Sequence, residues 1–428
     1  MKEKLVVAGG KSLGTIKHPK FPVFSKRAID RASGVIENGP MVALSRWSSV
    51  IDKVEKSLSK YHDGRHALGL SSGHASLQAS LIGLDVGPGD EVITTPYTWG
   101  ASISCILHQG AIPVFGDVDR NTGLLDAKCI EALITKRTKA ILVVHLYGQP
   151  ANMPAIMRVA KKNGLKVIED GSQAHGATWN GKRVGNFGDA AGFSCMGGKL
   201  LATGEAGYMV TPHEDVYWRA CLSTQHMGRS GDPGFPEEWR EYVDPLQYTY
   251  RMSSVMAVLL EEQLKKLDKE IDCRQENVDT LRDLLKDSKH IRFPNYGKSA
   301  KPAYHMVTMN FRAGGEGVSR DAFVLALRAE GMPVFSYVAS PITTWKRMNW
   351  RGYEGPKVMW MDNLRRAKVD YAAVEIPNCQ YKLDHAIEMA FNFIKPAKKQ
   401  MELIASMVHR VEGNMDQVRE YELKLQGV

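Results

Sequence analysis

The 428-residue sequence lacks any apolar run of about 18 residues, so it predicts no membrane-spanning helix. The N-terminal stretch MKEKLVVAGGKSLGTIKHPK has only a short apolar patch and no signal-peptide core. No Pro/Gly/Ser-rich tract indicates disorder, and 43% hydrophobic with 24% charged residues is typical of a soluble globular protein. These absences favour a cytoplasmic protein that is long enough for one large and one smaller domain.

Cysteine is scarce, and no two of the six cysteines form a CxxC pair. This spacing argues against a zinc site or a disulfide framework and favours buried thiols in a reducing cytoplasm. We therefore expect no metal.

A strong charge bias and nucleotide-binding signatures are also missing. The formal charge of +9 is small for this length, and solvated Lys/Arg faces explain it better than an electropositive cleft. No basic cluster with interleaved aromatic residues predicts nucleic-acid binding. Residues 69–73 do not form GxGxxG, which disfavours a Rossmann oxidoreductase, and we find no internal repeat.

Strand and helix signals alternate from about residue 65 to 211. Near-continuous apolar strands separated by helices indicate a parallel sheet covered on both faces, with ligands beyond the carboxyl ends of its strands. The expected strands are Asp90–Thr98, Ala111–Asp119, Lys139–Gly148 and Lys166–Asp170. The expected helices are Ala75–Leu84, Thr98–Gln109, Asp126–Ile134 and Met153–Asn163.

The pattern changes after Arg251. Met252–Leu284 predicts one long helix or two abutting helices. Residues 303–311, 321–337 and 383–394 indicate a smaller α/β domain, and Pro396–Gln426 is helical and highly charged. We therefore expect a large domain at 20–258 and a smaller one at 259–428, with residues 1–19 packing near the smaller domain.

The segment Ile168–Thr211 contains most of the candidate catalytic residues. One strand ends in Glu169–Asp170, and a second, Ala190–Ser194, ends in a serine. A Gly-Gly-Lys turn follows and places Lys199 five residues after Ser194. The segment therefore gathers a carboxylate, a hydroxyl and an amine at one end of the predicted sheet.

These groups match the needs of pyridoxal phosphate (PLP). PLP requires a lysine that forms a Schiff base, a carboxylate at its pyridine nitrogen, phosphate donors at a helix N-terminus and an aromatic cover. Lys199 and Asp170 supply the first two, Ser72-Gly73-His74 and Ser194 supply the donors, and Trp99 covers the ring. Each residue alone also fits a structural role, such as a helix cap, a solvated lysine or a core tryptophan, so only the combination is specific.

The sequence resembles the DegT/DnrJ/EryC1/StrS family of sugar aminotransferases from about residue 20 to 395. The motifs are SSGHASLQASLIGLDVGPGDEVITTPYTWGAS, DVD, HLYGQPANM, IEDGSQAHGA, GNFGDAAGFSCMGGKLLATGEAG and YRMSSVMAVLLEEQL. The resemblance implies the fold type I architecture. In it, a mostly parallel seven-stranded sheet lies between helices, and a smaller C-terminal α/β domain follows. It also implies a homodimer with shared active sites.

Family roles carry over to matching positions. The resemblance implies that Asp170 meets the pyridine nitrogen, Gln173 lies near the 3-hydroxyl, Ser194 binds phosphate, Lys199 forms the Schiff base and Trp99 covers the ring. Members with histidine in place of the lysine are dehydratases, so retention of Lys199 favours transamination.

Three departures lie near the cofactor phosphate. His74 replaces the usual threonine, and Met196-Gly197-Gly198 replaces a loop that often carries Gln or Asn. Thr249 stands where an Asn normally reaches the phosphate of the neighbouring subunit. These changes leave open whether His74 and Thr249 contact the phosphate.

The resemblance implies amino transfer from L-glutamate or L-glutamine to a keto-sugar, nucleotide-linked or phosphorylated, or to a keto-cyclitol. Such reactions belong to amino-sugar, antibiotic or surface-glycan biosynthesis. The candidate substrate contacts, each with an equally good structural explanation, are His226, Arg229, Arg251, Tyr304, His305 and Tyr337. Two alternatives stay open: a PLP-dependent sugar dehydratase on the same scaffold, and a non-catalytic PLP-binding regulator, which only the altered phosphate loop supports.

Overall fold

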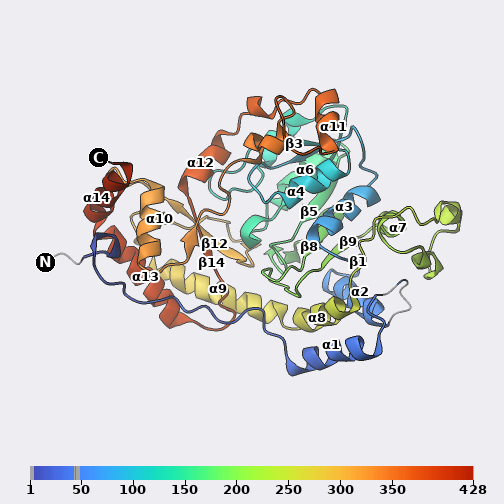
Figure 1. Cartoon of the computed structure of the whole chain (residues 1–428), viewed down its shortest axis with the longest axis horizontal. Helices are drawn as coiled ribbons and strands as arrows, with labels where there is room; N and C mark the ends of the chain where they lie inside the picture. The colour runs from blue at the N-terminus through green and yellow to red at the C-terminus, as the bar shows by residue number, and fades with distance from the viewer. Residues whose placement is uncertain (1–3, 43, 45–48, 428) are drawn as a thin grey trace.

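The computed structural model describes residues 4–42, 44 and 49–427. Its centre is a seven-stranded sheet in the order β1-β9-β8-β5-β4-β2-β3 (Figure 1). Neighbouring strands from β8 to β3 are parallel, whereas β9 is antiparallel to both β1 and β8. The mostly parallel seven-stranded sheet is therefore confirmed. Its strands are β1 His66–Leu70, β2 Glu91–Thr94, β3 Ile112–Phe115, β4 Thr138–Val144, β5 Lys166–Asp170, β8 Ala190–Ser194 and β9 Gly207–Thr211.

Helices cover both faces of this sheet, as its apolar strands require. On one face, α3 (Gly73–Gly83) packs against α4 (Ala101–His108) and α7 (Glu214–Thr224). On the other, α2 (Ser49–Tyr61) and α8 (Ser254–Leu264) share a core with Phe193 of β8. Because side chains alternate along a strand, Gly192 and Ser194 face α3 instead. A Cβ on Gly192 would lie 2.8 Å from the Leu77 side chain, so glycine lets α3 approach closely.

A second, four-stranded antiparallel sheet forms a separate core toward the C-terminus. Its order is β10-β12-β14-β13, and α10 (Arg320–Ala329) and α13 (Lys398–Glu412) pack with it. Leu5 is buried in the same core, so the N-terminal segment lies against this part of the chain (Figure 1). The strands are β10 Ile291–Arg292, β12 Met306–Phe311, β13 Val334–Phe335 and β14 Ala386–Ala390.

The remaining elements join or flank these two cores. α8 and α9 are separate helices, as one of the two sequence-based alternatives predicted, and they run along the lower side of the molecule in Figure 1. A three-stranded sheet has the order β11-β6-β7. These elements are α1 Lys26–Asn38, α5 Ala127–Ile130, α6 Met153–Lys162, β6 Thr178–Trp179, β7 Lys182–Arg183, α9 Leu267–Leu284, β11 Ala300–Lys301, α11 Trp360–Arg366, α12 Pro377–His385 and α14 Met415–Gln426.

Two expected helices are shorter than predicted. The expected helix at 98–109 begins only at Ala101, because residues 95–99 form a turn after β2. The expected helix at 126–134 is α5 followed by a 3-10 turn over Glu131–Leu133. In the described part of the chain, no helix is long and apolar enough to cross a membrane.

Residues 342–371 return to the large sheet. Ile342, Leu364 and Tyr371 share a buried cluster with Ile103 of α4 and Phe115 of β3. This segment, which carries α11, therefore packs beside the helix that follows Trp99.

Candidate active site

A cavity of about 430 Å³ opens at the carboxyl ends of the central strands, where open α/β sheets bind ligands. It gathers residues that are far apart in sequence, from the start of α3 to the loop after β13. Most of the residues singled out from the sequence line it: Ser72, Gly73, His74, Trp99, Asp170, Gln173, Ser194, Lys199, His305 and Tyr337.

The other candidate residues lie outside this cavity. Thr249 is exposed, and the His226 ring accepts a hydrogen bond from the Gly228 amide in a short 3-10 helix. Tyr304 is buried in the C-terminal core, and Arg251 pairs in a short bridge with Leu70 at the end of β1. None of these four side chains reaches the cavity of its own chain within the described residues.

Arg229 has an environment that fits the structural alternative to substrate contact. Its guanidinium is buried, with Glu55 at 3.1 Å and Asp232 at 2.8 Å. Tyr217 accepts a further hydrogen bond from it at 2.7 Å. Arg229 therefore anchors the loop after α7 to α2 instead of lining the cavity.

Asp170 ends β5 with both carboxylate oxygens fixed. The Ser102 hydroxyl donates to Oδ2 at 2.7 Å, and the Ser172 amide donates to Oδ1 at 3.0 Å. The side chain is only 5% exposed. A carboxylate held in this way can form a strong charge-assisted hydrogen bond with a cationic ring nitrogen. Sequence reasoning missed Ser102, although a small polar residue three positions after Trp99 was the available signal.

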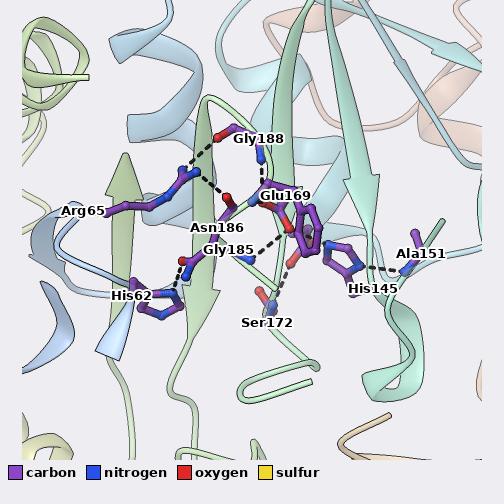
Figure 2. Close-up of polar contacts among 11 residues, drawn as sticks. His62, Arg65, His145, Ala151, Glu169, Ser172, Gly185, Asn186 and Gly188 are labelled. Carbon is purple, nitrogen blue, oxygen red and sulfur yellow. Dashed lines mark hydrogen bonds and ion pairs between the residues drawn. The ribbon is translucent and has the colours of Figure 1, made fainter. Parts of the chain in front are cut away.

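Glu169 precedes Asp170 on β5, so its side chain points to the opposite face of the sheet. Figure 2 shows it between the loop 185–188 and the His145 ring. Three backbone N–H groups of the loop 185–188 donate to its carboxylate at 2.8–2.9 Å. The His145 ring contributes a fourth contact at 3.2 Å. Because the Ala151 amide donates to Nδ1 of His145, Nε2 must carry the hydrogen that reaches Glu169. His145 also lines the cavity and was not predicted.

The loop 185–188 is held from its other side as well. Arg65 donates to the carbonyls of Asn186 at 2.6 Å and Gly188 at 2.8 Å, and His62 contacts the Asn186 side chain at 2.9 Å. Figure 2 shows these contacts on the side of the loop opposite Glu169. The loop 185–188 is thus held from both sides by hydrogen bonds within the protein.

We predict that Glu169→Gln lowers the free energy of unfolding by about 2–3 kcal/mol at pH 7, because an amide cannot accept all four donors. Burial alone would raise the pKa of Glu169, but the hydrogen bonds from His145 and the loop lower it below its usual value of 4.5. Because the pKa of Glu169 is lower in the folded state, the ionised carboxylate stabilises the fold at pH values above 4.5. This stabilisation is lost as the pH falls through the folded pKa.

Urea unfolding across pH 7 to 3 measures this effect. The difference in free energy of unfolding between wild type and Glu169→Gln should be largest at pH 7 and should decrease below about pH 4.5. The exposed Glu131→Gln variant is the matched control and should unfold like wild type. A gap that does not change with pH would contradict the role given to the ionised carboxylate.

Lys199 lies in the turn after β8, where its amide donates to the Met196 carbonyl at 2.8 Å. Its side chain lines the cavity and the residue is 9% exposed. Burial lowers the pKa of the amine, and the Asp170 carboxylate opposes part of that shift. A lowered pKa increases the neutral fraction, which is the form that attacks a carbonyl carbon.

The start of α3 forms a cradle for an anion. Ser72 caps the helix by accepting from the Ala75 amide at 3.1 Å, so the N–H groups of Gly73 and His74 have no partner within the helix. Ser194 lies directly beside them, since a Cβ on Gly73 would fall 2.4 Å from the Ser194 Cβ. The His74 Nε2 atom is buried with no hydrogen-bond partner in the described residues. Burial, followed by the nearby His108, lowers the pKa of His74.

Comparison with known proteins decides the family. The profile of the DegT/DnrJ/EryC1/StrS aminotransferase family matches residues 32–357. The chain belongs to this family. Its members use PLP, so the recognised family, the enzyme class and the cofactor are all confirmed.

Sequence relatives of this DegT/DnrJ/EryC1/StrS aminotransferase include two enzymes with named activities. GDP-perosamine synthase of Caulobacter vibrioides is 36% identical over 299 residues, covering 68% of this chain and 78% of the relative. L-glutamine:2-deoxy-scyllo-inosose aminotransferase of Streptomyces lividus is 35% identical over 307 residues, covering 68% and 70%.

Solved structures agree with the fold. The aminotransferase from Psychrobacter cryohalolentis has a TM-score of 0.79 at 26% identity, covering 93% of this chain and 99% of that one. The 3-amino-5-hydroxybenzoic acid synthase structure has a TM-score of 0.78 at 25% identity, covering 93% and 100%. The fold expected from the resemblance is therefore confirmed over most of the chain.

The residues of this aminotransferase fit PLP. A buried amine with lowered pKa, a fixed carboxylate and an N-terminal helix cradle line one cavity, and each matches one part of the cofactor. The close approach of Gly73 to Ser194, which leaves no room for a Cβ, brings the helix N–H groups and the Ser194 hydroxyl to one anion site.

Proposed function

We propose that this aminotransferase moves an amino group from L-glutamate or L-glutamine to a keto-sugar or a keto-cyclitol. The observation that carries the proposal is the pairing of Lys199 with Asp170 in a single cavity, with Ser102 holding the carboxylate at 2.7 Å. Two relatives named for perosamine and scyllo-inosose chemistry support this class of acceptor, and the second is named for L-glutamine as donor.

Each residue in the cavity has a distinct task. PLP supplies an electron-withdrawing ring, which lowers the barrier to proton removal from the donor's α-carbon. Nζ of Lys199 takes that proton, and in the return half-reaction it gives a proton to the carbon that carries the new amine. Asp170 would keep a positive charge on the ring nitrogen, and the Gly73 and His74 N–H groups and the Ser194 hydroxyl, all at the cavity, would hold the phosphate.

Trp99 and Tyr337 form the outer wall of the same cavity. Their rings are 5.8 Å apart, and Trp99 is 59% exposed, which is unusual for a core tryptophan. We place Trp99 over the face of the cofactor ring, where it excludes water from the reacting atoms. We place His305, which also lines the cavity, on the substrate side.

Thr249 is the residue that we expect to contact a second subunit. This residue is exposed and outside its own chain's cavity, and it follows the exposed side chains of Leu246 and Tyr248. We propose a homodimer in which Thr249 of one protomer reaches the phosphate cradle of the other.

The free thiols, four of them buried, fit a reducing cytoplasm.

Two half-reactions test this function separately. Adding L-glutamate or L-glutamine to the yellow protein should abolish the visible band of bound PLP and release one equivalent of the 2-oxo acid, whereas D-glutamate should do neither. The resulting amino form is then offered nucleotide-linked keto-sugars, phosphorylated keto-sugars and keto-cyclitols. Recovery of the band with amine appearing in the product supports the proposal. Loss of a substrate hydroxyl without amine incorporation would make the protein a dehydratase.

A further inference from the structure

Four residues at the cavity wall form a closed ring of hydrogen bonds through their side chains and two backbone amides. Nε2 of Gln173 donates to the Tyr337 hydroxyl at 3.0 Å, and the Tyr337 amide donates to Oε2 of Glu388 at 3.1 Å. The Tyr147 hydroxyl donates to Oε1 of Glu388 at 3.0 Å, and the Tyr147 amide donates to Oε1 of Gln173 at 2.8 Å. The ring joins the loops after β4 and β5 of the large sheet to β14 of the small sheet.

The ring is buried and centred on an acidic side chain. Glu388 is 1% exposed, and the Tyr97 hydroxyl adds a third donor at 3.2 Å. Burial raises the pKa of Glu388, while its hydrogen bonds and the buried Lys382 oppose that shift. Tyr147 adopts a left-handed backbone conformation with a φ of 61°, which is uncommon for a bulky residue. The left-handed backbone of Tyr147 is strained, and the three hydrogen bonds to the buried Glu388 carboxylate help to hold it in place.

The ring determines how Gln173 faces the cavity. A flipped amide would place the Nε2 donor against the Tyr147 N–H, so the orientation of Gln173 is fixed. One hydrogen of Nε2 goes to Tyr337, and the second remains for a ligand in the cavity that Gln173 lines. Tyr337 also contacts Trp99, with the two ring centroids 5.8 Å apart. Both cavity contacts therefore depend on where Tyr337 is held.

We propose that Glu388 is a positioning residue for the transamination proposed above: from the small sheet it fixes Tyr337, and through Tyr337 it sets the Gln173 amide and the Trp99 ring against the cofactor. The inference rests on the proposed function, because it assigns the unused Gln173 N–H to the oxygen on the cofactor ring. A donor at that oxygen changes the proton affinity of the Lys199–cofactor linkage, which the visible absorption band reports.

The first test removes one hydroxyl from the ring. Tyr337→Phe keeps the backbone contact to Glu388 but leaves Gln173 without its Tyr337 partner. We expect the pH midpoint of the visible band to shift by about one unit and kcat/KM to fall about tenfold, the effect of one hydrogen bond. Tyr371→Phe is the matched control, since its buried hydroxyl donates to the Pro113 carbonyl at 2.7 Å away from the cavity. Its midpoint and kcat/KM should equal those of wild type.

The second test replaces the centre of the ring. In Glu388→Gln the amide oxygen can accept from Tyr337 and the NH₂ can donate to the two tyrosine hydroxyls, so the midpoint should stay within about 0.3 units of wild type. Glu388→Leu removes the acceptor of the Tyr337 amide and leaves the Tyr147 and Tyr97 hydroxyls only their contact with each other at 3.0 Å, so it should reproduce the Tyr337→Phe shift. If Glu388→Leu does not fold, Glu388→Asp, whose shorter side chain draws the carboxylate back from the Tyr337 amide, should shift the midpoint in the same direction. An unshifted midpoint in the folded variant would overturn the role of Glu388.

The outcomes separate this inference from the proposed function. A wild-type protein that shows no visible band with added PLP would contradict the proposed function itself. A normal band with an unshifted midpoint in Tyr337→Phe, or equal shifts in Tyr337→Phe and Tyr371→Phe, would overturn only the positioning role of the ring.

Discussion

In Lys199→Ala, both half-reactions should fall by about 10⁴-fold, while the chain still folds and keeps the oligomeric state of the wild type. The variant loses the only amine that shares a cavity with Asp170 among the described residues, and with it the group that moves the α-proton. General acid–base catalysis contributes up to about 10⁴-fold, which sets the expected size of the loss. Single-turnover measurements with L-glutamate, and with a keto acceptor for the reverse direction, give both rates.

Chemical labelling identifies the same lysine independently. Borohydride reduction of the yellow protein, followed by peptide mapping, should place the pyridoxyl label on Lys199. Lys182→Ala changes an exposed lysine of β7 and serves as the control, with wild-type rates and labelling. A label on another residue, or appreciable turnover in Lys199→Ala, would remove the basis of the proposed mechanism.

Asp170→Asn should keep the cofactor but slow proton transfer by about 10³-fold, the size of one preorganised electrostatic contact. Asparagine can still accept from Ser102 or the Ser172 amide, so the side chain should stay in place. It cannot, however, supply the negative charge that keeps the ring nitrogen protonated. The ring then withdraws electrons less strongly, so the activation barrier to proton removal rises.

An isotope effect measures this step directly. With α-deuterated L-glutamate, the slowed half-reaction of Asp170→Asn should show a larger primary isotope effect than wild type, because proton transfer limits the rate. Asp189→Asn is a useful comparison, since its carboxylate accepts from the Val167 amide at 2.8 Å outside the cavity. That variant should lose stability but keep its proton-transfer rate. Near-normal kinetics in Asp170→Asn would argue against the pairing with the ring nitrogen.

Short motifs made much of the site predictable. Asp170, Ser194 and Lys199 lie within 30 residues of one another in the chain, so strand ends and a glycine-rich turn were enough to place them together. The large sheet was predictable for a similar reason, because its apolar strands alternate with helices. The cavity confirms that these neighbours in sequence are also neighbours in space.

Contacts between distant segments could not be predicted in this way. Glu388 follows Gln173 by 215 positions, and nothing near it in the sequence indicates that its carboxylate faces Tyr147. The segment 342–371 also returns to α4 without a local signal. Such contacts depend on how two sheets dock, which hydrophobic periodicity does not encode.

The contact between Gly73 and Ser194 has a consequence for how this site can vary. The spacing between the helix N–H groups and the serine hydroxyl depends on a missing methyl group, because a Cβ at position 73 would overlap Ser194. Any side chain there would push α3 away from β8 and widen the cradle for every ligand. The neighbouring position carries no such restriction, since its contribution to the cradle is a backbone amide. We therefore expect that histidine at position 74 leaves the anion site in place, and that substitutions there change phosphate affinity without changing the spacing set by Gly73 and Ser194.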